Sequence, residues 1–140
     1  EIYTLSLHDA LPISIGFPII QPPGGHAVYI DAKTLLKHIP PLQFPGQSLS
    51  VEMYRAGGIR TVEIGSVGFG KVDQNTGADL PSEMELVRLA IPRRTHTQSH
   101  IDYVVEVMKE IYEIKNELSG YKIVKQPKYL RHFTAEFIPL

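Results

Sequence analysis

An amphipathic stretch near residues 100–119 constrains the fold of this chain more than any other feature. Its apolar residues recur at helical spacing and form one face, made of Ile101, Val104, Val105, Met108, Ile111, Tyr112 and Leu118. Ser99, with Asp102 three residues later, is typical of a capped helix start, and Gly120 is typical of a stop. The pattern predicts a helix over residues 100–119, about 30 Å long at the standard rise per residue.

Short apolar runs between Gly and Pro signals predict the elements that surround this helix. Strands are expected at 27–30, 59–64, 85–91, 121–125 and 131–137, and helices at 31–38 and 45–56. Asp31 is the expected cap of the first of these helices, and Gly57-Gly58 the expected stop of the second. Residues 65–82 form a polar insertion with a turn at 75–77. Helices that alternate with strands around a small sheet give an α/β layer fold.

Composition narrows the class of protein. A chain of 140 residues, 43% apolar and 21% charged, is long enough for one domain with a hydrophobic core. The net charge of -1 gives no sign of a nucleic-acid or anionic-membrane partner, and no apolar run reaches the length of a bilayer span. The absence of cysteine excludes disulfides and thiolate metal sites and is compatible with a reducing cytoplasm.

Two segments contain side chains suited to binding. Arg88 begins the apolar tract Arg88-Leu89-Ala90-Ile91-Pro92, and His132 lies in the expected last strand. Arginine binds a carboxylate through two parallel hydrogen bonds, and histidine can donate, accept or titrate near neutral pH. On residue type and spacing alone, a surface role is favoured for Arg88 and a structural role for His132.

Both segments resemble the carboxy-terminal end of the pyridoxal-phosphate beta-eliminating lyases. The resemblance is strongest in five segments, at residues 24–32, 43–49, 58–66, 88–100 and 128–137, and extends from about Ile15 to Leu140. It implies the small carboxy-terminal domain of a fold-type I pyridoxal-phosphate enzyme, with helices packed on a small sheet. The resemblance also implies a carbon-carbon lyase of amino-acid catabolism, located in the cytoplasm, that assembles as a homotetramer.

The resemblance assigns roles to five residues of this chain. Arg88 matches the arginine that binds the α-carboxylate of the substrate. His132 and Phe133 match a His-Phe pair that lines the aromatic pocket in the branch acting on L-tryptophan; the sister branch, acting on tyrosine, has Phe-Phe. Val62 and Ile64 complete the pocket, and the sister branch has an arginine in place of Ile64 for the phenol hydroxyl. An apolar Ile64 would leave that hydroxyl unpaired, at a cost of about 1–3 kcal/mol.

The expected reaction is therefore α,β-elimination of L-tryptophan to indole, pyruvate and ammonia. The family places the Schiff-base lysine, the pyridine-nitrogen partner, the phosphate cradle and the potassium ligands upstream of this segment, so we expect no catalytic, cofactor-binding or metal-binding residue in this chain. The chain by itself is expected to be inactive. Two alternatives stay open: a part of a tyrosine-cleaving enzyme, and a free-standing α/β binding module without catalysis.

Two further motifs are weaker. The segment Gly65-Ser66-Val67-Gly68-Phe69-Gly70-Lys71 has the glycines of a phosphate loop, but Val72-Asp73 follows where Ser or Thr and a helix are required. His96 and His100 are four residues apart, but His96 precedes the expected helix and no third ligand is evident.

The opening segment, residues 1–14, resembles no part of the family. Up to Ile13 it matches one reading frame of a common short-read sequencing adapter, and Ser14 fits the codon at the junction. We interpret it as a translated artefact that does not belong to the fold, which leaves residues 15–140 as the domain.

Overall fold

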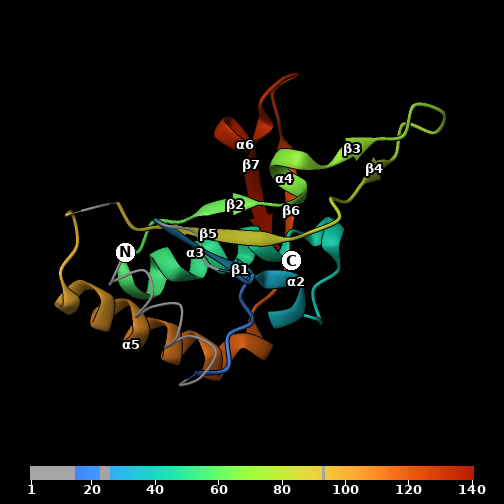
Figure 1. Cartoon of the computed structure of the whole chain (residues 1–140). Helices are drawn as coiled ribbons and strands as arrows, with labels where there is room; N and C mark the ends of the chain where they lie inside the picture. The colour runs from blue at the N-terminus through green and yellow to red at the C-terminus, as the bar shows by residue number, and fades with distance from the viewer. Residues whose placement is uncertain (1–14, 23–25, 93) are drawn as a thin grey trace.

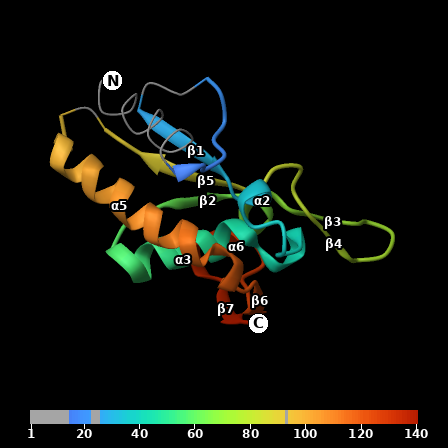
Figure 2. The same cartoon turned by 90° about the horizontal axis from the view of Figure 1, so that it is seen from below.

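A three-stranded antiparallel sheet and two helices form the centre of the molecule (Figure 1). The computed structural model describes residues 15–22, 26–92 and 94–140, so the segment interpreted as an artefact lies outside the described residues. The strands run in the order β1–β5–β2, with the bounds Ala27–Asp31, Leu86–Ala90 and Val62–Ile64. Two helices, α3 (Pro45–Gly57) and α5 (Gln98–Ile114), lie on one side of the sheet (Figures 1 and 2). This arrangement confirms the expected α/β fold of helices packed on a small sheet.

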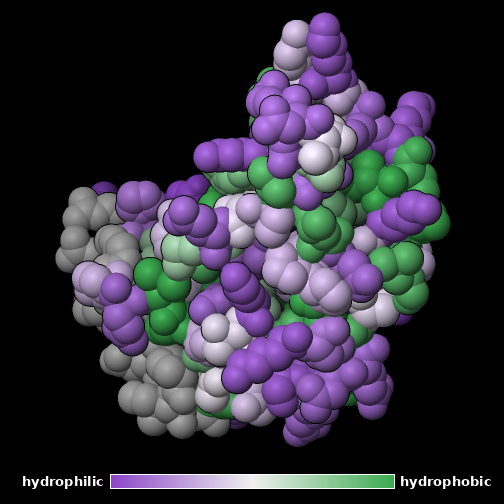
Figure 3. Space-filling model, turned by 90° about the vertical axis from the view of Figure 1, so that its right-hand side faces the viewer, coloured by the Kyte–Doolittle hydropathy of each residue, from purple (hydrophilic) through white to green (hydrophobic). Residues whose placement is uncertain are grey.

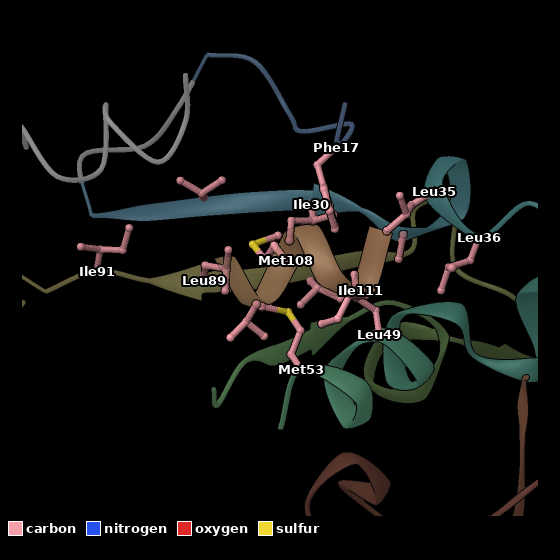
Figure 4. Packing of buried hydrophobic residues seen from close by; sticks show 14 of the residues in the cluster. Phe17, Ile30, Leu35, Leu36, Leu49, Met53, Leu89, Ile91, Met108 and Ile111 are labelled. Atoms are coloured by element: carbon pink, nitrogen blue, oxygen red, sulfur yellow. The ribbon is translucent and has the colours of Figure 1, made fainter. Parts of the chain in front are cut away.

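Strand alternation places the core between the sheet and the helices. Val28 is opposite Leu89 and Ile30 is opposite Val87, and all four side chains are buried. They meet Leu49 and Met53 of α3 and Met108 and Ile111 of α5 in one cluster (Figure 4). Every member of this group except Leu89 has no more than 1% of its surface exposed, as expected for a closely packed interior.

Helix α5 confirms the predicted amphipathic helix but begins and ends earlier. Its cap is Thr97 rather than Ser99, because His100 takes the place that Glu or Gln occupies in an ordinary capping box. The Nδ1 atom of His100 accepts the backbone N–H of Thr97 at 2.9 Å. After Ile114 the chain tightens into the 3₁₀ turn η3 (Lys115–Glu117).

Helix α3 matches its prediction closely, and helix α2 is shorter than predicted. Helix α3 ends at Gly57 and is followed by the cap residue Gly58, whose φ of 66° is easily adopted only by glycine. Asp31 caps α2 (Ala32–Leu35) through the N–H of Thr34 at 3.1 Å, as predicted. The helix stops before the predicted His38, because the chain turns at Leu36 and His38 donates to the carbonyl of Leu118 at 2.7 Å. A 3₁₀ turn, η2 (Pro41–Gln43), leads into α3.

The polar insertion at 65–82 contains regular structure. It begins with the single turn α4 (Ser66–Phe69) and continues into a small hairpin of β3 (Lys71–Val72) and β4 (Asp79–Leu80). The predicted turn at 75–77 is present. The Asp73 carboxylate accepts the N–H of Asn75 at 2.7 Å, and Gly77 has a φ of 71°.

The end of the chain differs from the prediction. Strand β6 (Tyr121–Lys125) pairs with β7 (Glu136–Pro139), so the second predicted strand begins five residues later than residue 131. The first half of that predicted strand is instead the helical turn α6 (Arg131–Thr134). Strand β2 is likewise shorter than the predicted 59–64 and forms one edge of the sheet. No helix within the described residues is long and apolar enough to span a membrane.

The core makes a matched pair of leucine substitutions informative. Leu49→Ala should lower the free energy of unfolding by about 2–5 kcal/mol, because Leu49 is completely buried and its removal leaves a cavity. Leu42→Ala removes the same atoms from a side chain that is 43% exposed and should cost less than about 1 kcal/mol. Urea denaturation followed by circular dichroism measures both values. Equal losses would contradict the described core.

Candidate functional site

A cavity of about 530 Å³ lies beside the edge strand β2. Helix α3 supplies one wall, with Tyr54 and Arg55 among its residues. Segment 59–63, the start of α4 and the turn α6 supply the remainder, through residues that include Arg60, Val62, Glu63, Val67, His132 and Phe133. Three of the five predicted site residues, Val62, His132 and Phe133, therefore line one cavity although they are up to 71 positions apart in the chain.

Arg88 and Ile64 do not line this cavity, but the sheet places both near it. Arg88 is directly opposite Val62 in the β2–β5 ladder, and Ile64 is opposite Leu86. Residues opposite each other in such a ladder point to the same side of the sheet, and alternate residues share that side. Arg88, Val62 and Ile64 thus share the face that points away from the buried Val87 and Leu89.

The Arg88 guanidinium has unused donors. It is half-buried and makes no hydrogen bond or ion pair with any described residue. Its Nε atom is shielded from solvent and has no partner. A buried donor without a partner costs about 1–3 kcal/mol, so the side chain is suited to an anion that would pair with it.

His132 lies on a helical turn, which corrects the prediction that it lies in a strand. Leu130 adopts a left-handed conformation with a φ of 54° and reverses the chain before α6. The His132 ring then lies 4.1 Å, centroid to centroid, from the ring of Phe133. On its other side His132 faces Gly68 of α4. Phe133 is 73% exposed, so the His-Phe pair forms a wall with one open side.

Arg131 holds this turn in place, a role that no motif in the sequence indicates. Its Nε donates to the carbonyl of Val67 at 2.8 Å, and a terminal nitrogen donates to the carbonyl of Ser66 at 2.6 Å. Its guanidinium also lies 5.9 Å from the ring of Phe44. We call these two hydrogen bonds the Arg131 latch, because they tie α6 to α4 and so position His132.

Two glutamates whose carboxyl groups are shielded from solvent lie in the same region. Glu63 lines the cavity, and its pKa rises to about 7 because burial and the nearby charge of Glu85 both disfavour its ionised form. The backbone amides of nearby residues lower that pKa by less, and none meets the carboxyl at hydrogen-bond geometry. Burial also raises the pKa of Glu85, against hydrogen bonds from Ser66 that lower it.

The remaining motifs show no comparable arrangement. The rings of His96 and His100 are 5.6 Å apart, and His100 serves the helix cap. No group of three or more His, Cys, Asp or Glu residues suited to a metal occurs within the described ranges. In segment 65–71, Gly65 precedes α4, Gly68 lies within it and Gly70 follows it, and α4 is only four residues long.

The Arg131 latch can be tested by one substitution with a matched control. Arg131→Gln should lower the free energy of unfolding by about 1.5–3 kcal/mol, because two carbonyls lose a charged donor. Arg55→Gln removes a surface ion pair with Glu52 and should cost less than about 1 kcal/mol. Urea denaturation at fixed pH compares the two. Indistinguishable losses would show that the latch contributes nothing.

Comparison with known proteins relates this geometry to a group of enzymes. No family model matches the chain. A tryptophanase of Salinibacter ruber is 58% identical over 136 residues, which is 97% of this chain and 28% of that protein. A tryptophanase of Rhodobacter capsulatus is 53% identical over 124 residues, and a tyrosine phenol-lyase of Pasteurella multocida is 46% identical over 124 residues, each covering 89% of this chain and 27% of the relative.

The chain thus spans a little over a quarter of the length of the curated relatives it matches, and the match is to their carboxy-terminal portion. The match to the Salinibacter protein is longer than residues 15–140 and so includes part of the opening segment, whose interpretation as an artefact stays a prediction. Tryptophanases and tyrosine phenol-lyases both occur among the relatives at 46% identity or more. The chain therefore belongs to the family of tryptophanases and tyrosine phenol-lyases.

Proposed function

We propose that this chain is the substrate-binding, carboxy-terminal part of a tryptophanase, which converts L-tryptophan to indole, pyruvate and ammonia. The observation that carries the proposal is the placement of Arg88 directly opposite Val62, at the edge of a cavity whose other wall is His132 and Phe133. A carboxylate on Arg88 would leave the aromatic side chain of the same substrate within reach of that cavity. The identity reaches 58% with a tryptophanase and 48% with a tyrosine phenol-lyase, which supports the same choice.

Each of these residues has a distinct task in the proposed reaction. Arg88 binds the α-carboxylate through its planar guanidinium group. This contact holds the reacting carbon in a fixed position relative to the sheet. Val62 and Phe133 offer apolar surface to the indole ring. His132 can donate to or stack on the edge of that ring, and Ile64 offers nothing to a phenol hydroxyl.

The cavity does not fit a Schiff base between pyridoxal phosphate and this chain. No lysine lies among the residues that line it. We therefore assign cofactor and potassium binding to the three quarters of the relatives that this chain does not span, and derive no step through them. The homotetramer and the cytoplasmic location also stay predictions.

Tyrosine phenol-lyase activity is the second candidate, and one observation favours it. Arg55 and Arg60 both line the cavity, and either could hydrogen-bond a phenol oxygen. Arg55 is engaged with Glu52 at 3.3 Å, and Arg60 lies 5.9 Å from the Tyr54 ring. Both arginines thus have partners within the chain, which makes them weaker candidates than a free arginine at position 64. A non-catalytic binding module has no such supporting observation.

A chimeric enzyme tests the proposed function. Residues 15–140 would replace the matching part of the Salinibacter ruber tryptophanase, and catalytic efficiency would be measured with L-tryptophan and L-tyrosine. We expect indole release, with tryptophan preferred by roughly tenfold or more, because an apolar pocket rejects a hydroxyl only moderately. The unmodified Salinibacter enzyme is the positive control, and the 140-residue chain alone should show no turnover. Higher efficiency with tyrosine would move the assignment to tyrosine phenol-lyase.

The carboxylate role of Arg88 is tested in the same chimera. Arg88→Ala should lower catalytic efficiency by well over tenfold, because removing one partner of a desolvated ion pair costs about 2–5 kcal/mol. Arg88→Lys should recover little of this, since lysine lacks the bidentate fork. Arg94→Ala, an exposed arginine from the same tract, is the matched control and should change little. Unchanged efficiency in Arg88→Ala would contradict the role.

A further inference from the structure

Two glutamates place their carboxyl groups in the space that a side chain on Gly65 would occupy. Glu63 lies on β2, and Glu85 immediately precedes β5 and has no accessible surface. One oxygen from each carboxyl lies closer than 3.0 Å to the position that a Cβ atom would occupy on Gly65. Only a residue without a side chain fits between them, so the glycine allows two acidic groups to share one buried space.

The two carboxyls are not equally supplied with donors. Glu85 accepts the backbone N–H of Ser66 at 3.0 Å and also the Ser66 hydroxyl, which in turn accepts the N–H of Ser82 at 2.9 Å. Both oxygens of Glu63 are shielded from solvent and have no hydrogen-bond partner in the described part of the chain. The hydrogen bonds from Ser66 therefore offset part of the cost of burying charge on Glu85, whereas no hydrogen bond of good geometry does so for Glu63.

The surrounding charged groups do not compensate Glu63. From α2, the charge of Lys33 reaches Glu85 and lowers its pKa. From α3, Arg55 pairs with Glu52, and from α6, Arg131 donates to the carbonyls of α4. His132 lies beside Gly68, and Arg88 points to the opposite face of the sheet from Glu63. No cation pairs with Glu63 among the residues that the structure describes.

The predicted response to pH follows from the direction of the shift. The pKa of Glu63 is raised from its ordinary value to about 7, first by burial and then by the charge of Glu85. The folded chain thus keeps a proton that the unfolded chain releases at lower pH. The contribution of Glu63 to folding stability is therefore fully present below its ordinary pKa of 4.5 and is lost as the pH rises from there to about 7.

The pair is connected to the cavity wall by one residue. Ser66, which donates to Glu85, is also the residue whose carbonyl holds one arm of the Arg131 latch. Val67, which holds the other arm, follows it in α4. The latch positions α6, which carries His132 and Phe133. A displacement at the carboxyl pair would therefore reach both aromatic residues through α4.

We propose that Glu63 and Glu85 act as a proton-controlled positioning device for the His132–Phe133 wall. With a proton on Glu63, the pair packs around Gly65 and α4 is held. When that proton is released to solvent, two carboxylates face each other in a buried space, and α4 and the latch move apart from β2. The substrate role of the wall rests on the proposed function, whereas the device itself is a property of the 140-residue chain.

A titration of the 140-residue chain tests the device without any assay of activity. Glutamate side chains labelled with ¹³C at the carboxyl carbon would be followed by NMR from pH 4 to 9, and Glu63 assigned from the signal lost in Glu63→Gln. We expect Glu63 to titrate near 7. The chemical shifts of the His132 and Phe133 rings should also change, with a transition that has the same midpoint. Titration of Glu63 at its ordinary value of 4.5 would overturn the proposal.

Variants separate the device from ordinary structural support. Between pH 5 and 8 the folding equilibrium constant of the native chain should fall by more than tenfold, and in Glu63→Gln this fall should disappear. Glu113→Gln, an exposed glutamate on α5, is the matched control and should keep the fall. An equal fall in Glu63→Gln, or ring signals that respond to pH identically in that variant, would refute the proposal. If Glu63→Gln does not fold, variants of the other glutamates identify their own signals, and the signal that remains belongs to Glu63. The midpoint of that signal in the native chain then decides. Failure of the chimera to release indole would overturn the proposed function and leave this result unaffected.

Discussion

The alternation of side chains along β5 connects the core to the candidate site. Val87 and Leu89 are buried against the helices, and Arg88 between them points to the other face. A slip of one residue would bring the guanidinium into the core and expose both apolar side chains, at a cost of several kcal/mol. The packing of the sheet on α3 and α5 therefore fixes the position of Arg88. The antiparallel register with β2 then places Val62 beside it.

Elements defined by their own periodicity could be predicted from the sequence. The apolar face of α5, the Asp31 cap and the Gly58 stop are local signals, and the structure confirms the elements that they indicate. The alternation that buries Val87 and Leu89 was likewise readable as a strand at 85–91. The resemblance to known lyases added what periodicity lacks, which is the expectation that residues 62 and 132–133 share a cavity.

The elements that were missed depend on contacts between distant residues. The turn α6 is held by Arg131, whose acceptors are 64 and 65 residues away, so residues 131–134 read as the start of a strand. The turn α4 is held by Glu85, which is 19 residues from Ser66. Nothing in the local pattern of residues 65–82 indicates that a buried carboxylate will order the insertion. The local sequence suggests for Gly65 only a place in a phosphate loop. In the structure, the missing side chain of Gly65 leaves space for two carboxyl groups.

The residues that line the candidate site are largely exposed to solvent, which limits how much of a ligand they can enclose. Phe133 is 73% exposed and Val62 is 49% exposed, although both line the cavity. Figure 3 shows apolar side chains in separate groups among polar ones on the face that carries the β3–β4 hairpin. Sites for small molecules enclose most of their ligand, commonly 70–90% of its surface, so an indole ring resting on Phe133 and Val62 alone would keep much of its apolar area in water. Since the transfer of apolar surface out of water supplies most of the affinity for such a ring, this wall by itself would bind tryptophan weakly. The cavity wall on this chain therefore exposes more of the ring than a complete small-molecule site would.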